Sequence, residues 1–438
     1  MELFRKRRAR FLEALGDGVA IFATAPQRVR SNDVHYEYRP DTDFYYLTGF
    51  AEPDALAVLD PRDGERPFTL VVRPRDWNKE VWSGRRAGVE GAVSSYGADR
   101  AEPVEKLAEV ITRAVTNVDR LHYKLGRYPA IDSMVLGAIR DVGAKSRDGL
   151  WAPAAIVDPG AIMQEMRLIK TADDLDLFRR AAAISVQGHL AAMRATRPGL
   201  FEYEVEAVLE FVFHKLGSPA PGFASIVASG PNACYLHHWR NDRRIGDGEL
   251  LLVDAGAEWE CFSGDITRTY PANRRFTGPQ ATIYQLVLDA QLAAISRIRP
   301  GAVFQEVHDA AVEVLTEGLV RLGFIEGPVR EAIESDRYKR FYMHKTSHWL
   351  GMDVHETCSY RVKGEWRTLQ EGMLFTVGHG DRPRGDHGGG AEDHRGPGAS
   401  GGAPGDARRA GGPVMAGVDT GGAPAARQRE PPGQDPGG

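Results

Sequence analysis

Two aspartates and two histidines are the residues whose types and spacing could do chemistry. Asp254 ends the apolar run at residues 250–253, and Asp265 begins a second β-like run shortly afterwards. If a short turn joins the two strands, both carboxylates meet at one point, where they repel each other unless a cation lies between them. Further along the chain, His348 and His355 add imidazoles. Carboxylates with one imidazole suit a hard or borderline divalent cation such as Mn²⁺.

Each of these residues, taken alone, also has a simpler structural interpretation. An aspartate at a strand end is commonly a turn or capping residue, and an isolated histidine is commonly a hydrogen-bonded core or surface group. It is the combination of two closely spaced acids with imidazoles that favours a metal site.

The elements that must position these residues divide into two domains. Residues 1–165 predict a mixed α/β domain that starts with a helix through Leu15 and contains short strands at 18–22, 55–59 and 68–72. The second domain, 166–377, opens with Thr171 and Asp174 at the spacing of a capping box. Three further helices flank the aspartate strands, at 203–216, 281–298 and 303–322. This pattern is typical of an α+β fold with helices outside a curved antiparallel sheet.

Composition sets limits on partners and compartment. The 438 residues carry a formal net charge of −5, which gives no indication of nucleic-acid or membrane partners. The basic start is not followed by the apolar core of a signal peptide, and no run approaches the roughly 20 apolar residues that span a bilayer. Three well-separated cysteines without a C-x-x-C pair suit a reducing cytoplasm. Cys261 is expected to be a buried filler.

Several strings around these residues resemble aminopeptidase P, the Xaa-Pro aminopeptidase of the creatinase, prolidase and methionine-aminopeptidase superfamily. They are Leu-Val-Asp-Ala-Gly at 252–256, Gly-Asp-Ile-Thr-Arg-Thr at 264–269, Leu-His-His at 236–238 and the stretch 343–356. The string His-Trp-Leu-Gly at 348–351, together with His355, is specific to this superfamily. The resemblance covers residues 1–377 and implies an aminopeptidase P-type amino-terminal domain followed by a pita-bread metallopeptidase domain.

The resemblance implies metal-dependent removal of the first residue from peptides whose second residue is proline. It implies two Mn²⁺ ions per subunit, with Asp254, Asp265 and His348 among their ligands. It also implies roles near the substrate for four residues: His237 and His355 as catalytic residues, and His344 and Trp82 as substrate-binding residues. In the family, a tryptophan at the position of Trp82 reaches into a neighbouring subunit's active site, which implies a homo-oligomer, a dimer or a tetramer. Taken alone, Trp82 could be a core residue and His344 a structural hydrogen-bonding group.

The sequence changes character at Gly378. Residues 378–438 contain no Leu, Ile, Phe, Trp or Tyr and are rich in Gly and Pro, so we predict that they are disordered. Gly378 stands where the family has a metal-binding glutamate, and a second family glutamate has no counterpart. We interpret this segment as the product of a shifted reading frame, and the pita-bread domain as incomplete at its C-terminus. Within this segment, Glu392, Asp393 and His394 are the substitute donors that we consider.

Four hypotheses about function follow. The first is a dinuclear metallo-aminopeptidase that acts on Xaa-Pro peptides. The second is a catalytically inactive homologue, a binding or scaffolding protein that lacks two glutamate ligands. The third is a prolidase-type Xaa-Pro dipeptidase, which only substrate length would distinguish from the first. The fourth is a metal-independent creatinase-type enzyme, which Asp254 and Asp265 disfavour.

Overall fold

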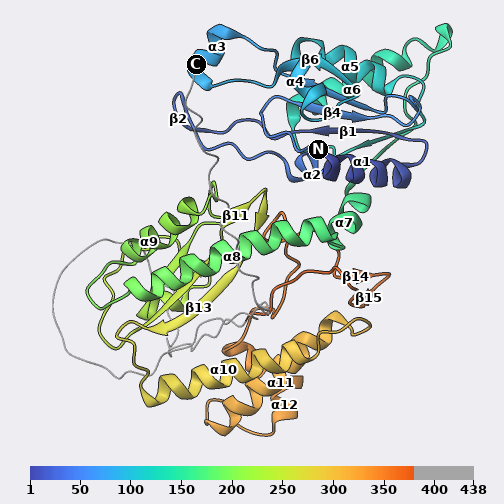
Figure 1. Cartoon of the computed structure of the whole chain (residues 1–438). Helices are drawn as coiled ribbons and strands as arrows, with labels where there is room; N and C mark the ends of the chain where they lie inside the picture. The colour runs from blue at the N-terminus through green and yellow to red at the C-terminus, as the bar shows by residue number, and fades with distance from the viewer. Residues whose placement is uncertain (379–438) are drawn as a thin grey trace, which may run out of the picture.

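The computed structural model describes residues 1–378, and the segment predicted to be disordered lies outside the described residues from 379 onward. Two units lie one above the other, joined through helices α7 (Gly160–Leu168) and α8 (Ala172–Ala195) (Figure 1). The upper one, here called the N-terminal unit, is built around a six-stranded sheet. The lower one, here called the second unit, contains a smaller antiparallel sheet between pairs of helices.

The sheet of the N-terminal unit is mixed. Its strand order is β6-β5-β4-β1-β7-β8, with β1 antiparallel to β4 and parallel to β7. The strands are β1 (Val19–Ala23), β4 (Leu56–Leu59), β5 (Phe68–Val72), β6 (Arg100–Pro103), β7 (Arg120–Tyr123) and β8 (Ala155–Val157). The predicted strands at 18–22, 55–59 and 68–72 are confirmed to within one residue at their ends.

Both faces of this sheet are covered at its centre, so strands β1, β4 and β5 are buried along their whole length and almost entirely apolar. Leu56 and Val58 of β4 pack into the core beside α5 (Leu107–Val115) and α6 (Pro129–Gly143). The alternate residues Ala57 and Leu59 enter the opposite core, beside α1 (Glu2–Leu15), α2 (Thr42–Thr48) and α4 (Gly88–Ser94). Successive side chains of a strand point to opposite faces, and here each face meets a layer of helices.

The sheet of the second unit positions both aspartates. Its strands are β9 (Ile226–Ser229), β10 (Leu250–Ala255) and β13 (Ile266–Pro271), in the antiparallel order β13-β10-β9. Asp254 lies opposite Thr267, and Asp265 immediately precedes β13. A small hairpin of β11 (Glu258–Trp259) and β12 (Phe262–Ser263) connects β10 to β13. This connection brings the two carboxylates together, as the spacing predicted.

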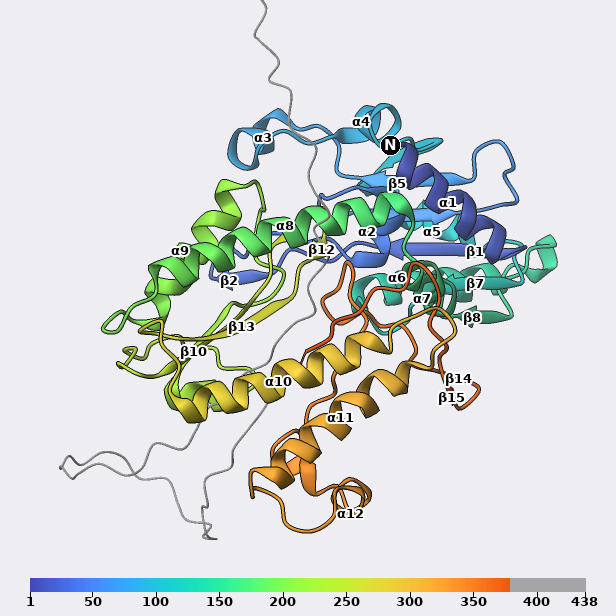
Figure 2. The same ribbon diagram turned by 60° about the horizontal axis from the view of Figure 1, so that its bottom comes forward.

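Helices lie on both sides of this sheet (Figure 2). On one side, α8 and α9 (Glu202–Lys215) pack on β10 through apolar residues such as Ile184, Leu209 and Val253. On the other side, α10 (Gly278–Ser296) packs against α11 (Phe304–Arg321). The predicted capping box of Thr171 and Asp174 is confirmed at the start of α8. Helix α10 begins earlier than the predicted residue 281, because Thr277 and Gln280 form a second capping box.

The described chain ends in an extended segment beside the loop that carries His348. Backbone hydrogen bonds join Leu350 N to Leu374 O (3.0 Å), Thr376 N to His348 O (3.0 Å) and Gly378 N to Thr346 O (2.8 Å). The remaining short elements are β2 (Val29–Ser31), β3 (Val34–His35), α3 (Trp77–Ser83), α12 (Val329–Glu334), β14 (Arg361–Val362) and β15 (Glu365–Trp366). Among residues 1–378, no helix has the length and apolar composition that crossing a bilayer requires.

Candidate functional site

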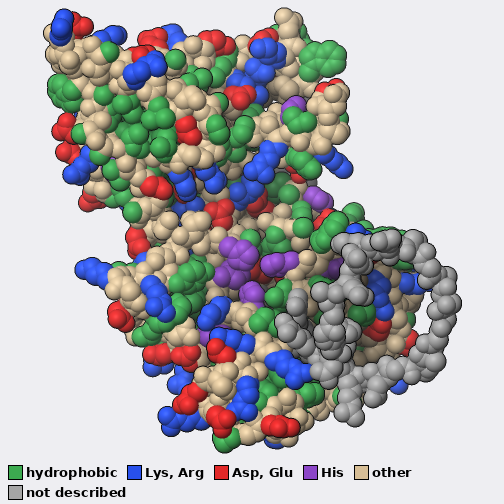
Figure 3. Space-filling view, turned by 180° about the vertical axis from the view of Figure 1, so that it is seen from behind, with side chains coloured by type: hydrophobic (Ala, Val, Ile, Leu, Met, Phe, Trp, Pro, Cys, Tyr) green, Lys and Arg blue, Asp and Glu red, His purple; other side chains and the backbone are tan. Residues whose placement is uncertain are grey.

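A cavity of about 310 Å³ in the second unit gathers six of the seven predicted site residues. They come from β10, from the start of β13 and from two loops: Asp254, Asp265, His237, His344, His348 and His355. Histidine side chains cluster on one face of the molecule, below the N-terminal unit (Figure 3). The seventh residue, Trp82, does not line this cavity.

The two aspartates form the acidic floor of this cavity. Oδ1 of Asp254 is buried and has no hydrogen-bond partner among the described residues. Burial, and then the neighbouring Asp265, raise the pKa of Asp254 well above its usual range, while the hydroxyl of Thr267 acts in the opposite direction. A buried carboxylate oxygen without a donor is costly unless a proton or a cation meets it. The pair is therefore suited to bind a cation.

A backbone carbonyl helps to orient the ring of His348. Its Nδ1 lies 3.1 Å from the carbonyl oxygen of Trp349, to which it can donate in the tautomer that is protonated at Nδ1. Its Nε2 then faces the cavity and lies 3.1 Å from Oδ2 of Asp265. Metal-binding histidines commonly donate their second ring nitrogen to a backbone carbonyl in this way.

His355 stands next to His348 at the mouth of the cavity. The two ring centroids are 4.4 Å apart and the rings cross at 70°. Partial burial, and then the neighbouring His348, lower the pKa of His355. A neutral imidazole at this position can accept a proton or pass one to a bound molecule.

His237 and His238 lie in a turn, not in a strand. In a strand, the side chain of His238 would point to the face opposite His237; because this segment is not a strand, both histidines line the cavity. His238 also lines the cavity, where its Nε2 accepts from the backbone N–H of Asn241 (3.3 Å) and lies 3.4 Å from Glu202 Oε2. Only the neighbouring Gly-Pro-Asn at 230–232 could have signalled a turn here.

The two predicted substrate-binding residues occupy very different places. His344 lines the cavity, and its Nδ1 lies 2.7 Å from the carbonyl oxygen of Lys345. Trp82 lies on α3 of the N-terminal unit, where 90% of it is exposed, and Trp77 of the same helix is exposed as well. Trp82 is not the core residue that was considered as an alternative.

Cys261 is a buried residue, as predicted. It belongs to the hydrophobic core between the two units. Burial raises the pKa of its thiol to about 12, so the reactive thiolate is scarce at neutral pH. It plays no part in the chemistry of the cavity.

The donor set fits a divalent cation in its chemistry but is incomplete in its geometry. Two carboxylates and one imidazole line the same cavity, yet within residues 1–378 no group of three or more His, Cys, Asp or Glu side chains is arranged to hold a metal ion. Gly378, which has no side chain to offer, lines the cavity at the position where the resemblance implies a glutamate. The substitute donors Glu392, Asp393 and His394 lie outside the described residues.

Two family models match the chain. Residues 176–394 match the model of metallopeptidase family M24, which includes the sheet and loops around the cavity. Residues 4–122 match the model of the aminopeptidase P N-terminal domain. The two matches correspond in order to the two units of the structure.

Known proteins resemble the chain over most of its length. The Xaa-Pro aminopeptidase of Escherichia coli K12 is 37% identical over 376 residues, which are 85% of each chain. An aminopeptidase of known structure from Pseudomonas aeruginosa is 44% identical, with a TM-score of 0.84 over 86% of this chain and 85% of the other. A zinc-substituted E. coli aminopeptidase P in complex with product is 37% identical, with a TM-score of 0.83 over 86% of both chains.

Proposed function

Because the chain belongs to metallopeptidase family M24, among the Xaa-Pro aminopeptidases of the aminopeptidase P type, we propose that it releases the first residue from peptides with proline at position two. The observation that carries this proposal is the cavity in which Asp254 presents a buried, unpartnered oxygen beside Asp265 and His348. Such an arrangement attracts a cation in front of an open space that is large enough for part of a peptide.

Asp254, Asp265 and His348 are the donors that the described chain would offer to a divalent ion, for which we propose Mn²⁺. A bound divalent ion supplies two things, a more acidic water and a polarised substrate carbonyl. The protein's own contribution is to fix the donors. Asp254 is held by strand β10, Asp265 by the start of β13 and His348 by the carbonyl of Trp349.

Histidines at the mouth of the cavity suit the special demand of an Xaa-Pro bond. This bond is a tertiary amide without an N–H, so its nitrogen must gain a proton to leave as an amine. His355 and His237 both line the cavity, and we assign them to hold the developing charge and to deliver that proton. His344 is assigned to the substrate wall of the same cavity.

Trp82 fits a role between subunits. Its side chain is almost fully exposed and does not line the cavity of its own chain. We propose that the protein is a homo-oligomer in which Trp82 of one subunit closes the substrate cavity of another. A reducing, cytoplasmic location is proposed with it, because the buried thiols of Cys261 and Cys358 have raised pKa values and no disulfide.

The decisive test is metal-dependent hydrolysis of Ala-Pro-Ala by the full 438-residue chain. We expect release of alanine in the presence of Mn²⁺, none after chelation, and none from Ala-Ala-Ala. The Asp254→Asn variant, which keeps the shape of the side chain, should be inactive. Absence of metal-dependent release from the wild-type chain would contradict the proposal, and cleavage of the dipeptide Ala-Pro alone would favour a dipeptidase.

A further inference from the structure

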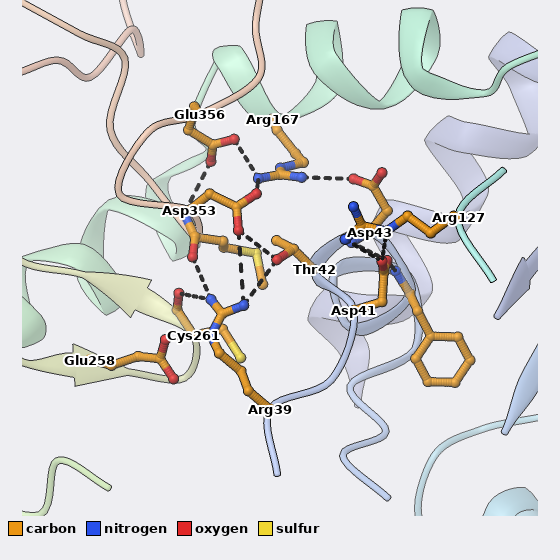
Figure 4. A network of polar contacts seen from close by, with 12 residues as sticks. Arg39, Asp41, Thr42, Asp43, Arg127, Arg167, Glu258, Cys261, Asp353 and Glu356 are labelled. Atoms are coloured by element: carbon orange, nitrogen blue, oxygen red, sulfur yellow. Dashed lines mark hydrogen bonds and ion pairs between the residues drawn. The ribbon is translucent and has the colours of Figure 1, made fainter. Parts of the chain in front are cut away.

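The loop that carries His355 is held from the N-terminal unit. Oδ1 of Asp353 accepts from the hydroxyl of Thr42 (2.7 Å), and the carbonyl of Met352 accepts from Nη2 of Arg39 (2.6 Å). Figure 4 shows Arg39 and Thr42 reaching the loop from the segment around α2. Arg39 and Thr42 of the N-terminal unit therefore contact Met352 and Asp353, which precede His355 in its loop.

Arg39 also holds the connection between the two aspartate strands. Its Nε donates to Oε2 of Glu258 (2.7 Å) and its Nη2 to the carbonyl of Cys261 (3.3 Å), both on or beside the β11–β12 hairpin. Its Nη1 donates to the hydroxyl of Thr42 (3.1 Å). One guanidinium thus ties the histidine loop to the hairpin that joins β10 to β13 (Figure 4). A planar guanidinium presents five donors in a fixed fork, so it can satisfy more acceptors, and in more defined directions, than the three donors of a lysine.

A second arginine, on helix α7, holds the same loop. Arg167 is almost fully buried and donates to Asp43 (2.7 Å), to Asp353 (2.5 Å) and to Glu356 (2.5 Å). Glu356 in turn accepts from the backbone N–H of Met352 (3.0 Å). Charged side chains therefore hold residues 352–356 at both ends of the segment.

The loop depends on these contacts because it has open space on two sides. Val354 and His355 line the cavity of the proposed active site, and they also line a neighbouring cavity of about 470 Å³ that Arg39, Lys124 and Arg127 border. Among residues 1–378, no hydrogen bond holds the imidazole of His355 itself. The place of the ring is thus set by the backbone of its loop, and the backbone is set by Asp353 and Met352.

We propose that Arg39 and Thr42 are positioning residues for His355, so that the N-terminal unit sets the geometry of the catalytic cavity. This inference rests on the proposed function, because it is that function which assigns a catalytic role to His355. The imidazole must lie close to the substrate, and displacements of about 1 Å cost on the order of 100-fold in rate. Loss of the Thr42 hydroxyl frees one oxygen of Asp353 and loosens the loop without touching any residue that lines the catalytic cavity.

The test compares Thr42→Val with Thr42→Ser. The valine has the same shape but no hydroxyl, and the serine keeps the hydroxyl. With Ala-Pro-Ala and Mn²⁺, we expect Thr42→Val to lower kcat by roughly tenfold with KM within about twofold, and Thr42→Ser to stay near the wild type. The control is Arg127→Met, which removes a charge from the wall of the neighbouring cavity and an ion pair with Asp41, but no contact with loop 352–356.

Two readouts do not require activity. Hydrogen exchange of peptides that cover 352–357, and carbethoxylation of His355 followed by mass spectrometry, should be faster in Thr42→Val than in Thr42→Ser or Arg127→Met. If the wild-type chain hydrolyses nothing, the proposed function fails, and these two rates alone decide whether the loop is anchored as described. Asp353→Asn, which leaves α2 untouched, is the second variant if Thr42→Val does not fold. Equal kcat, exchange and carbethoxylation in the valine and serine variants would overturn the inference.

Discussion

The cavity and the network between the two units are both rich in charge, but their charges are satisfied in opposite ways. In the network, Arg167 meets three carboxylates, and Arg39 fills its donors with one carboxylate, one hydroxyl and two carbonyls. In the cavity, two carboxylates lie together, and one oxygen of Asp254 has no partner in the described part of the chain. Each carboxylate of the network has a cationic partner, although the buried Nε of Arg167 makes no hydrogen bond within residues 1–378, whereas Oδ1 of Asp254 in the cavity has neither a cation nor a donor there.

This difference separates a structural role from a functional one. A buried charge that is paired with its partners fixes the local geometry. If one partner is removed, the remaining charge stays buried without compensation, and its desolvation then destabilises the folded protein. A buried acid that lacks a partner costs stability in the free protein, and a ligand that completes it recovers that cost. The comparison therefore predicts opposite signs for substitutions in the two regions.

The largest effect is expected at Arg167. Arg167→Met keeps the apolar stem but leaves Asp43, Asp353 and Glu356 without their shared cation, so we expect a loss of about 3–5 kcal/mol in the free energy of unfolding. Urea denaturation at neutral pH measures this loss. The matched control is Arg127→Met, whose half-exposed ion pair with Asp41 should contribute about 0–1 kcal/mol. Similar losses in both variants would remove the distinction between the network and the surface.

A substitution of Asp254 is expected to increase the stability of the metal-free protein. In metal-free protein, Asp254→Asn should raise the free energy of unfolding by about 1–3 kcal/mol at pH 8, because it removes a buried acid that lacks a partner. Chelated wild type and variant are compared by urea denaturation. A destabilised variant would mean that the carboxylate of Asp254 is already satisfied in the free protein.

The pH dependence of the metal-free protein should follow from the same residue. The folded pKa of Asp254 is raised above its unfolded value, so the folded chain retains a proton that the unfolded chain releases. Stability from this group therefore falls as the pH rises from the ordinary aspartate pKa through the raised one. Mn²⁺ competes with that proton, so its stabilising effect should grow over the same range. Melting temperatures at pH 5 and pH 8, with and without Mn²⁺, check both trends, and Asp254→Asn should show neither.

The smallest effect is expected at Gly378, where a substitution should change the affinity for Mn²⁺. Its backbone is held to Thr346 beside the cavity, so a carboxylate added there can reach the unsatisfied pair. Gly378→Glu should tighten Mn²⁺ binding on the order of tenfold, ~1.4 kcal/mol, as measured by calorimetry. Gly378→Gln has the same size without the charge and should leave the affinity near that of the wild type. Equal affinities in the two variants would show that residue 378 does not contribute a ligand.

The sequence allowed the cavity to be predicted far better than the network. Asp254 and Asp265 mark the ends of recognisable apolar runs, so local pattern sufficed to bring them together. The contacts of Arg39 and Arg167 join residues that are far apart in the chain, and nothing in the local pattern around either arginine specifies its partner. His238 lines the cavity beside His237 because the two histidines are not in a strand, which strand-like alternation could not have indicated. The exposure of Trp82 was not predicted, although its sequence neighbours are largely polar and charged, because a tryptophan is on average a highly buried residue.

The reach of Arg39 has a consequence for the order in which the molecule is made. Its partners Glu258 and Met352 lie 219 and 313 residues further along the chain, so during synthesis the N-terminal unit emerges long before they exist. Domains generally fold as they emerge, and contacts between distant residues form late. The guanidinium of Arg39 in the N-terminal unit therefore emerges from the ribosome as a donor whose acceptors do not yet exist, and the histidine loop that supplies one of them, the carbonyl of Met352, is translated 313 residues later.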